Sequence, residues 1–375
     1  IDELLEKSTP EAPMWNIEKI RQGLKSNWNY IDGVMIKAVL QMYDVTKDEK
    51  YLKFADNFID YRVHEDGTID GYSIGEKNID NVNAGKTLFE LYDLTGKEKY
   101  KKAVDLVYSQ IEIMPRCQNE ARSFWHKDIY PNQVWLDGLY MGLPFYLEYE
   151  TRYNDRKNYS DIFGQFKFVI ENMRNPINGL YFHAMDTSRE AFWCDKVTGL
   201  SQHSWLRAIG WYTMALIDTL DQVDNKDHKY DAECKMLEDA FKDLVDSMLK
   251  YQDESGMWYQ VVNYGGMEKN YLETSGSSIM AYAILKGVRL GYLPESYREY
   301  AEKAIDGICA KYLKTDEGEM SLGGICLVAG LGGKDERPGT YDYYMSEPIV
   351  EDDAKGVGPF LLAYTEMLTY KKNNK

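Results

Sequence analysis

The chain has 375 residues, 44% of them hydrophobic, so it is long enough to bury a sizeable core. Its net charge is −17 and its isoelectric point is near 4.9, which argues against binding to nucleic acid or to anionic membrane surfaces. The five cysteines are widely spaced, odd in number and show no CxxC, so we expect neither a disulfide framework nor a zinc site.

An internal repeat marks the first two predicted units. The sequence YDVTKDEKY at 43–51 returns as YDLTGKEKY at 92–100. An apolar run at 31–42, with residues on every helical face, precedes the first copy, and an amphipathic run at 51–59 follows it. A helix that is apolar all round is buried, and an amphipathic one covers it. The repeat therefore predicts pairs of one inner and one outer helix.

The same alternation continues to the end of the chain, where strand signals are few and short. A looser third unit has a buried run at 134–149 and an outer run near 159–173, and further helical runs lie at about 204–222, 230–252, 274–292, 296–313 and 353–371. Roughly a dozen helices of this kind fit a double ring, and the absence of a linker predicts one domain over residues 1–375. Two long irregular stretches, 176–202 and about 315–350, are typical of loops that build a site.

One carboxylate stands out in the segment FWHKDIYPNQVWLDGLYMGLPF, residues 124–145. Asp137 lies among Trp135, Leu136 and further apolar residues. A helix start is already offered by Asn132, so capping does not account for Asp137. Burying a carboxylate costs free energy unless it is paired or used, so we interpret Asp137 as a functional residue.

Other polar or aromatic side chains also fall where inner helices are predicted to begin. If the inner helices run parallel, these starts meet at one mouth, where free N–H groups and the helix dipoles favour an anion such as a sugar carboxylate. The alternative for an Asp, Ser or Thr at a helix start is a capping role, which we favour for the last four of the set. The set comprises Tyr30, Asp80, His126, His203, Trp205, Arg207, Thr274, Ser275, Asp352 and Asp353.

Known cofactor and nucleophile motifs are absent. The sequence has no HExxH, GxSxG or GxGxxG, and NAGKT lacks the first glycine of a phosphate loop. The five histidines show no metal-ligand spacing. We therefore expect no metal and no cofactor.

The 124–145 segment closely resembles the signature of the unsaturated rhamnogalacturonyl hydrolases, glycoside hydrolase family 105. The resemblance spans nearly the whole chain and implies an (α/α)6 double-ring barrel of six helical hairpins, an all-α fold that agrees with the helix pairs above. Five further motifs carry it: NIDNVNAGK, GLYFHAMD, WLRAIGW, NYLETSGSSIMAYA and SEPIVEDDAKGVGPF.

Roles for individual residues follow from this resemblance. It implies that Asp137 is the catalytic acid and that Asp80 is its partner carboxylate. It also implies that Arg207 binds the uronate carboxylate. Further substrate contacts are expected from Tyr30, His126, His183, Trp205 and Trp211.

The chemistry implied by the resemblance is a hydration of an enol ether. Substrates of the family carry a C4=C5 double bond at a non-reducing uronic acid, left there by polysaccharide lyases. An acid protonates C4, water adds at C5, and the resulting hemiketal collapses and releases the next sugar. An Asp in water is almost fully ionised at neutral pH, so an apolar setting and a nearby carboxylate would help Asp137 to keep its proton.

The residues leave several alternatives open. The first expectation is unsaturated galacturonyl-rhamnose from pectin rhamnogalacturonan, and the second an unsaturated β-glucuronyl linkage of the ulvan or arabinogalactan type. An ordinary glycosidase using Asp80 and Asp137, a lyase on the same architecture, and a non-catalytic carbohydrate-binding protein are the others.

The expected partner is a small unsaturated oligosaccharide, with no nucleic acid or membrane, and we expect a monomer or weak dimer. The resemblance implies a bacterial protein of the periplasm or the cytoplasm. The chain begins at Ile1 rather than Met, for which a trimmed leader is one explanation.

Overall fold

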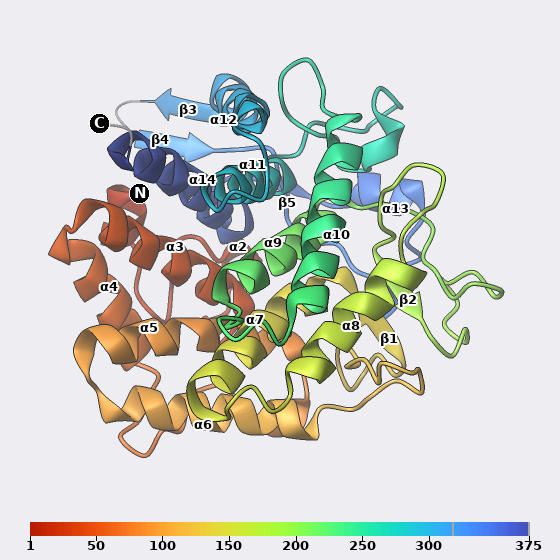
Figure 1. Ribbon diagram of the computed structural model, residues 1–375. Helices are drawn as coiled ribbons and strands as arrows, with labels where there is room; N and C mark the ends of the chain where they lie inside the picture. The colour runs from red at the N-terminus through yellow and green to blue at the C-terminus, as the bar shows by residue number, and fades with distance from the viewer. Residues whose placement is uncertain (317–318, 374–375) are drawn as a thin grey trace.

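Six inner helical elements close a ring in the computed structural model, which describes residues 1–316 and 319–373 (Figure 1). Each element packs against the next along the chain, and the last, α14, packs back against the first, α3. The inner elements are α3 (Tyr30–Thr46), the 3-10 helix η2 (Ile79–Gly85) continued by α5 (Lys86–Thr95), α7 (Leu136–Tyr153), α9 (Leu206–Gln222), α11 (Thr274–Arg289) and α14 (Ala354–Asn373).

An amphipathic outer helix follows each of the first five inner elements. These outer helices are α4 (Glu49–Asp60), α6 (Glu98–Ile113), α8 (Tyr159–Asn172), α10 (Asp231–Leu249) and α12 (Arg298–Tyr312). The outer side of α14 borders a groove that it shares with α12 and with residues of the short N-terminal helix α1 (Asp2–Glu6). The predicted all-α (α/α)6 barrel is confirmed, whereas the single domain over 1–375 stays a prediction.

The sequence repeat forms the turn between an inner and an outer helix. In the first copy the Tyr43 hydroxyl donates to Glu49 at 3.3 Å, and in the second Tyr92 donates to Glu98 at the same distance. Both turns end the inner helix with a residue in the left-handed region, Lys47 (φ 57°) in one and Gly96 (φ 68°) in the other. The repeated letters are therefore the capping and turn residues of two equivalent hairpins.

The two turns predict opposite effects of exchanging their left-handed residues. Lys47→Gly should raise the free energy of unfolding by up to about 1 kcal/mol, because glycine adopts a positive φ without steric cost. Gly96→Ala should lower the free energy of unfolding by about 1 kcal/mol through the positive φ alone, since a Cβ there would meet no atom of the described residues within 4 Å. Urea denaturation of both variants checks this. Equal effects of the same sign would contradict the capping argument.

Short strands and loops lie where the inner helices α7 and α11 begin. In the part of the chain that the structure describes, the strands form three two-stranded antiparallel sheets, and two of the pairs contact inner helices α7 and α11. Both predicted irregular stretches contribute to these sheets. The strands are β1 (Gln133–Trp135) with β2 (Ala184–Asp186), β3 (Leu313–Asp316) with β4 (Glu319–Leu322), and β5 (Ile325–Cys326) with β6 (Ile349–Val350).

Four short helices complete the loops, together with one more helix that is important for the site. These are α2 (Ile17–Gln22), η1 (Ile74–Glu76), η3 (Val262–Tyr264) and η4 (Glu295–Tyr297), and the site helix is α13 (Tyr341–Ser346). Among the described residues, no helix is both long enough and apolar enough to cross a membrane.

Candidate active site

Asp137 is the second residue of α7, and a strand pairing fixes the position of that helix start. Trp135 caps α7 without a side-chain hydrogen bond and pairs with Ala184 in the β1–β2 ladder. The Leu136 amide donates to the carbonyl of His183 at 3.1 Å. The backbone that carries Asp137 is thus hydrogen-bonded to the backbone that carries His183, although the two are far apart in sequence.

Asp137 and His183 face each other. Nε2 of His183 lies 3.3 Å from Oδ2 of Asp137, and their side chains are 0% and 14% exposed. Both atoms are buried, and neither makes a hydrogen bond within the described residues. Hydrogen bonds of a catalytic site are often long or poorly aligned before substrate binds. The prediction that Asp137 does not serve as a helix cap agrees with this geometry.

Asp80 lies in a different electrostatic setting. It belongs to η2, where Oδ2 is 2.8 Å from the Lys127 ammonium and Oδ1 is 3.4 Å from Nε2 of His126. Burial alone would raise the pKa of Asp80, but attraction to Lys127 and His126 outweighs burial and holds that pKa well below its usual range. Asp80 is therefore an ionised carboxylate at neutral pH and a poor proton donor.

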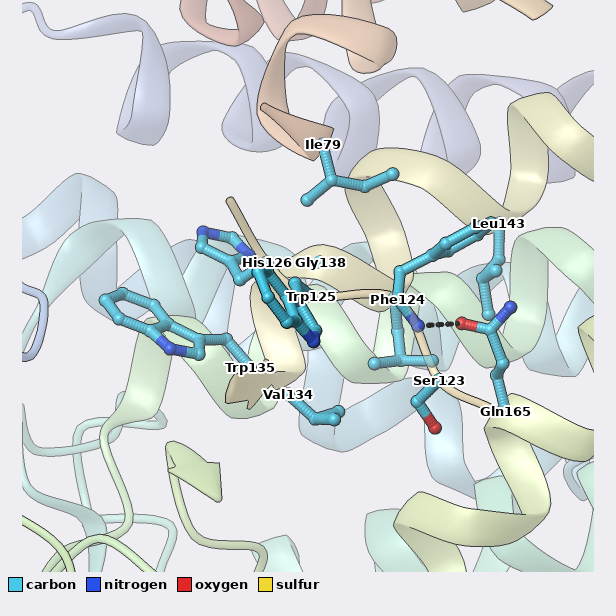
Figure 2. A pocket seen from close by; sticks show the side chains of 11 residues that line it. Ile79, Ser123, Phe124, Trp125, His126, Val134, Trp135, Gly138, Leu143 and Gln165 are labelled. Carbon is cyan, nitrogen blue, oxygen red and sulfur yellow. Dashed lines mark hydrogen bonds between the residues drawn. The ribbon is translucent and has the colours of Figure 1, made fainter. Parts of the chain in front are cut away.

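His126 contacts Asp80 and packs on the start of α7, the helix that carries Asp137. Its ring is stacked on Trp135 with centroids 4.6 Å apart and planes 2° from parallel (Figure 2). A Cβ on Gly138, the residue after Asp137, would lie 3.0 Å from Nδ1 of His126, so the ring packs closely on the start of α7. The cavity of about 10 Å³ drawn in Figure 2 is too small for a sugar.

A larger pocket opens beside Asp80. Its volume is about 260 Å³, and its lining includes Tyr30, Asp80 and Lys127. Burial is the main reason that the pKa of Tyr30 lies well above its usual value, so the phenol stays neutral and can donate a hydrogen bond. Tyr30, Asp80 and Lys127 can therefore offer a neutral donor, an anion and a cation to a ligand in this pocket.

Trp205 and Arg207 come together as expected, but in a buried setting. The Arg207 guanidinium lies 4.8 Å from the Trp205 ring, and both side chains are 1% exposed. Arg207 donates to the Ser275 hydroxyl at 3.2 Å and to the carbonyls of Cys326 and Leu327. Its contact with a uronate stays a prediction, and its observed bonds anchor β5 to the starts of α9 and α11.

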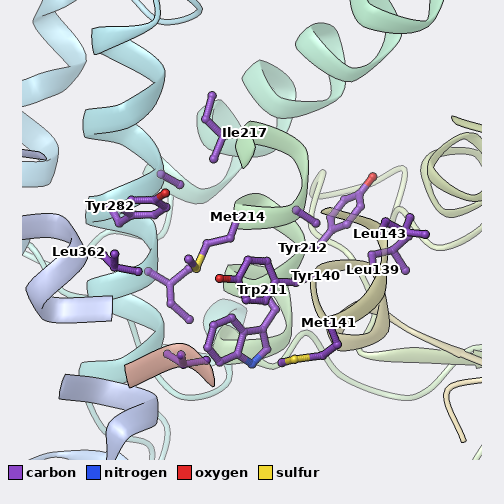
Figure 3. Close-up of a cluster of buried hydrophobic side chains, with 14 of the residues drawn as sticks. Leu139, Tyr140, Met141, Leu143, Trp211, Tyr212, Met214, Ile217, Tyr282 and Leu362 are labelled. Carbon is purple, nitrogen blue, oxygen red and sulfur yellow. The ribbon is translucent and has the colours of Figure 1, made fainter. Parts of the chain in front are cut away.

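Trp211 is packed in the apolar core of the barrel. It is 1% exposed and is stacked on Tyr140, with ring centroids 5.1 Å apart. Figure 3 shows it among Met141, Met214 and other apolar side chains of the inner helices. The structure does not bring Trp211 into the pocket lining beside Asp80, and its role as a substrate contact stays a prediction.

The predicted capping residues are only partly correct. The N-cap of α11 is Glu273, which accepts from the amides of Ser275 and Gly276, so Thr274 and Ser275 are not the caps. A hydroxyl at a helix start can instead bind a neighbouring loop, as Thr274 does when it donates to the Gly323 carbonyl. Asp353 does act as expected and accepts from the amide of Lys355 at 2.9 Å.

Two residues at the site were not predicted from the sequence. Lys127 follows His126 directly, and that adjacency was the available signal for it. Tyr344 lies in the second irregular stretch, and its hydroxyl is 2.7 Å from Nδ1 of His183. Within residues 1–316 and 319–373, no group of three or more His, Cys, Asp or Glu side chains is arranged to hold a metal.

Comparison with known sequences places this chain among the glycoside hydrolases. Residues 7–371 match the profile of Glycosyl Hydrolase Family 88. A curated Agrobacterium fabrum protein, Atu3128, is 40% identical over 235 residues, which are 61% of this chain and 98% of that protein. The unsaturated rhamnogalacturonyl hydrolase YesR of Bacillus subtilis is 25% identical over 288 residues, 75% of each chain.

Solved structures of glycoside hydrolases are similar to this chain. A family 105 glycoside hydrolase of C. acetobutylicum superposes with a TM-score of 0.88 at 44% identity and covers 98% of this chain and 99% of its own. An unsaturated glucuronyl hydrolase specific for heparin has a TM-score of 0.67 at 12% identity, covering 99% of this chain and 94% of its own, and shares the fold alone.

Proposed function

The chain belongs to the glycosyl hydrolases of families 88 and 105, and we propose that it removes the 4,5-unsaturated galacturonic acid from rhamnose in lyase-generated pectin fragments. Membership of this family supports the broader activity, that of an unsaturated uronyl hydrolase. The curated relative YesR acts on rhamnogalacturonyl substrates by its name, which supports this choice of sugar. An unsaturated β-glucuronyl linkage is the second candidate.

The observation that carries the mechanism is the unequal setting of the two carboxylates. Asp80 is paired with Lys127 and held ionised, whereas the Oδ2 of Asp137 has no hydrogen bond to any described residue and faces His183. A general acid must hold a proton to give, and Asp80 does not. Asp137 is therefore the proton donor in the proposed reaction.

The proposed steps balance as follows. The carboxyl proton of Asp137 moves to C4, the C4=C5 electron pair forms the new C–H bond, and the ring oxygen shares the positive charge at C5. Water adds to C5 and returns one proton to the Asp137 carboxylate. The C5–O bond of the hemiketal then breaks to leave a ketone, and the opened C1 hemiacetal releases the leaving sugar.

Binding of the substrate carboxylate needs a local cation, because the whole chain carries a net charge of −17. We assign this role to Arg207, with Lys127 as the cation on the pocket wall beside Asp80. Tyr30 and His126 lie beside Asp80 and would contact the sugar hydroxyls, while His183 and Trp205 would enclose the reacting end.

Ultraviolet absorbance of lyase-generated unsaturated disaccharides tests the proposal. The conjugated double bond absorbs and the ring-opened product does not, so absorbance should fall as rhamnose appears. Galacturonyl-rhamnose should react faster than glucuronyl fragments from ulvan or glycosaminoglycans, and the reverse order would favour the second candidate. Release of sugar at constant absorbance would indicate an ordinary glycosidase, and rising absorbance on an intact polymer would indicate a lyase.

A further inference from the structure

Tyr344 contacts the side of the His183 ring opposite to Asp137. It lies on α13, and its hydroxyl is 2.7 Å from Nδ1 of His183. Both side chains are 0% exposed. The Tyr344, His183 and Asp137 side chains thus form a buried row in which the imidazole separates a phenol from the candidate acid.

The direction of the hydrogen bond follows from the partners that are available. Burial is the main reason that the pKa of Tyr344 lies well above its usual value, so the phenol keeps its hydrogen. Within the described part of the chain, His183 Nδ1 is the hydrogen-bond partner of this hydroxyl. If Nδ1–H donated to the phenol oxygen, the phenol hydrogen would be buried without an acceptor, which costs free energy. Tyr344 therefore donates and Nδ1 accepts.

A neutral imidazole that accepts at Nδ1 carries its hydrogen on Nε2. Packing fixes where that N–H points: Trp135 lies edge-on to the ring at 5.4 Å and Trp205 lies tilted at 4.8 Å. Nε2 faces Oδ2 of Asp137, the fully buried oxygen of that carboxyl group. The exposed part of the side chain leaves Oδ1 as the oxygen within reach of a substrate.

We propose that Tyr344 is a positioning residue that fixes the Nε2–H tautomer of His183 and so directs the acidic proton of Asp137 onto Oδ1. An N–H facing Oδ2 cannot accept a proton from that oxygen, so the acidic hydrogen lies on Oδ1, toward the substrate. After the proton has moved to the substrate, the same N–H donates to the new carboxylate and stabilises it. The catalytic part of this inference rests on the proposed function, whereas the tautomer does not.

Nitrogen-15 NMR of histidine-labelled protein tests the tautomer without substrate. The chain has five histidines, and His183→Gln identifies the signals of His183 by their loss. We expect an unprotonated Nδ1 and a protonated Nε2 in the wild type and a mixture of tautomers in Tyr344→Phe. A protonated Nδ1 in the wild type would overturn the inference, even if the variant failed to fold.

Kinetics with matched variants test the positioning role. Tyr344→Phe should lower kcat about 10- to 100-fold with KM within about twofold, because a wrong His tautomer impairs proton transfer more than binding. Tyr343→Phe is the control, since Tyr343 is the neighbouring residue and its hydroxyl accepts from the Gly330 amide. It should keep kcat within about threefold.

The kinetic outcomes separate this inference from the proposed function. An unchanged kcat in Tyr344→Phe, or equal losses in both tyrosine variants, would overturn the positioning role. If the wild type consumed no unsaturated disaccharide while His183 still showed the Nε2–H tautomer, the proposed function would fail and the tautomer assignment would stand.

Discussion

Asp137→Asn is expected to lower kcat on an unsaturated disaccharide by about 10²- to 10⁴-fold, the contribution typical of a general acid. The amide keeps the size of the carboxyl group but has no acidic proton for C4. Substrate binding should change little, because the pocket beside Asp80 and Lys127 is untouched. Continuous ultraviolet absorbance assays give kcat. Calorimetric titration of the nearly inactive variant gives the Kd of uncleaved substrate.

A matched carboxylate away from the site serves as the control for Asp137→Asn. Asp161 on the outer helix α8 pairs with Arg116 at 2.8 Å, and Asp161→Asn should keep wild-type turnover. Near-normal turnover in Asp137→Asn would contradict the assignment of the acid. A matching loss in thermal stability and in binding would instead mean that the change disrupts the start of α7.

The helical pairs could be predicted from sequence because their signal is local. The repeat at 43–51 and 92–100 contains the turn residues of two equivalent hairpins, and the predicted run at 353–371 differs from α14 by only one residue at its start and two at its end. The pairing of β1 with β2 could not be predicted, since its strands have three residues each and lie about fifty residues apart. Such short strands carry no periodicity.

The candidate site could be predicted in part for a similar reason. Asp137 was evident as a costly charge in an apolar run, and Asp80 as a polar residue before an inner helix. The contact between His183 and Tyr344 joins residues 161 positions apart, which no local pattern encodes. The burial of Arg207 and Trp211 was also hidden, because a motif gives residue types and does not give the depth at which the fold places them.

Lys86→Met is expected to stabilise the protein by about 1–4 kcal/mol at pH 6, because folding disfavours the charged lysine and methionine carries no charge. Lys86 begins α5, and its ammonium lies 3.5 Å from the centroid of the Tyr140 ring. Burial lowers the pKa of Lys86 to about 7. Below that pH the folded protein carries a partly buried ammonium that donates to the Tyr140 carbonyl, and methionine keeps the apolar stem without the charge.

The sign of the pH dependence makes this expectation specific. An unfolded lysine has a pKa of about 10.4, so between about pH 7 and pH 10 the unfolded wild type binds more protons than the folded one. Wild-type stability should therefore rise with pH across this window relative to Lys86→Met, and the gap between the two should shrink. Urea denaturation at pH 6 and pH 9 measures that gap, and a gap that is independent of pH would contradict the argument.

Lys37 provides the control of opposite sign for Lys86. It lies on α3, one of the inner elements, but its ammonium is 2.6 Å from Glu90. Burial works to lower the pKa of Lys37, but Glu90 outweighs it and the pKa is raised, so folding favours the charged form. Lys37→Met should therefore destabilise the protein at neutral pH by leaving Glu90 without its partner. If both variants stabilised the barrel, apolar burial alone would explain them. The distinction between Lys86, whose described partner is the Tyr140 carbonyl, and Lys37, whose partner is a carboxylate, would then be wrong.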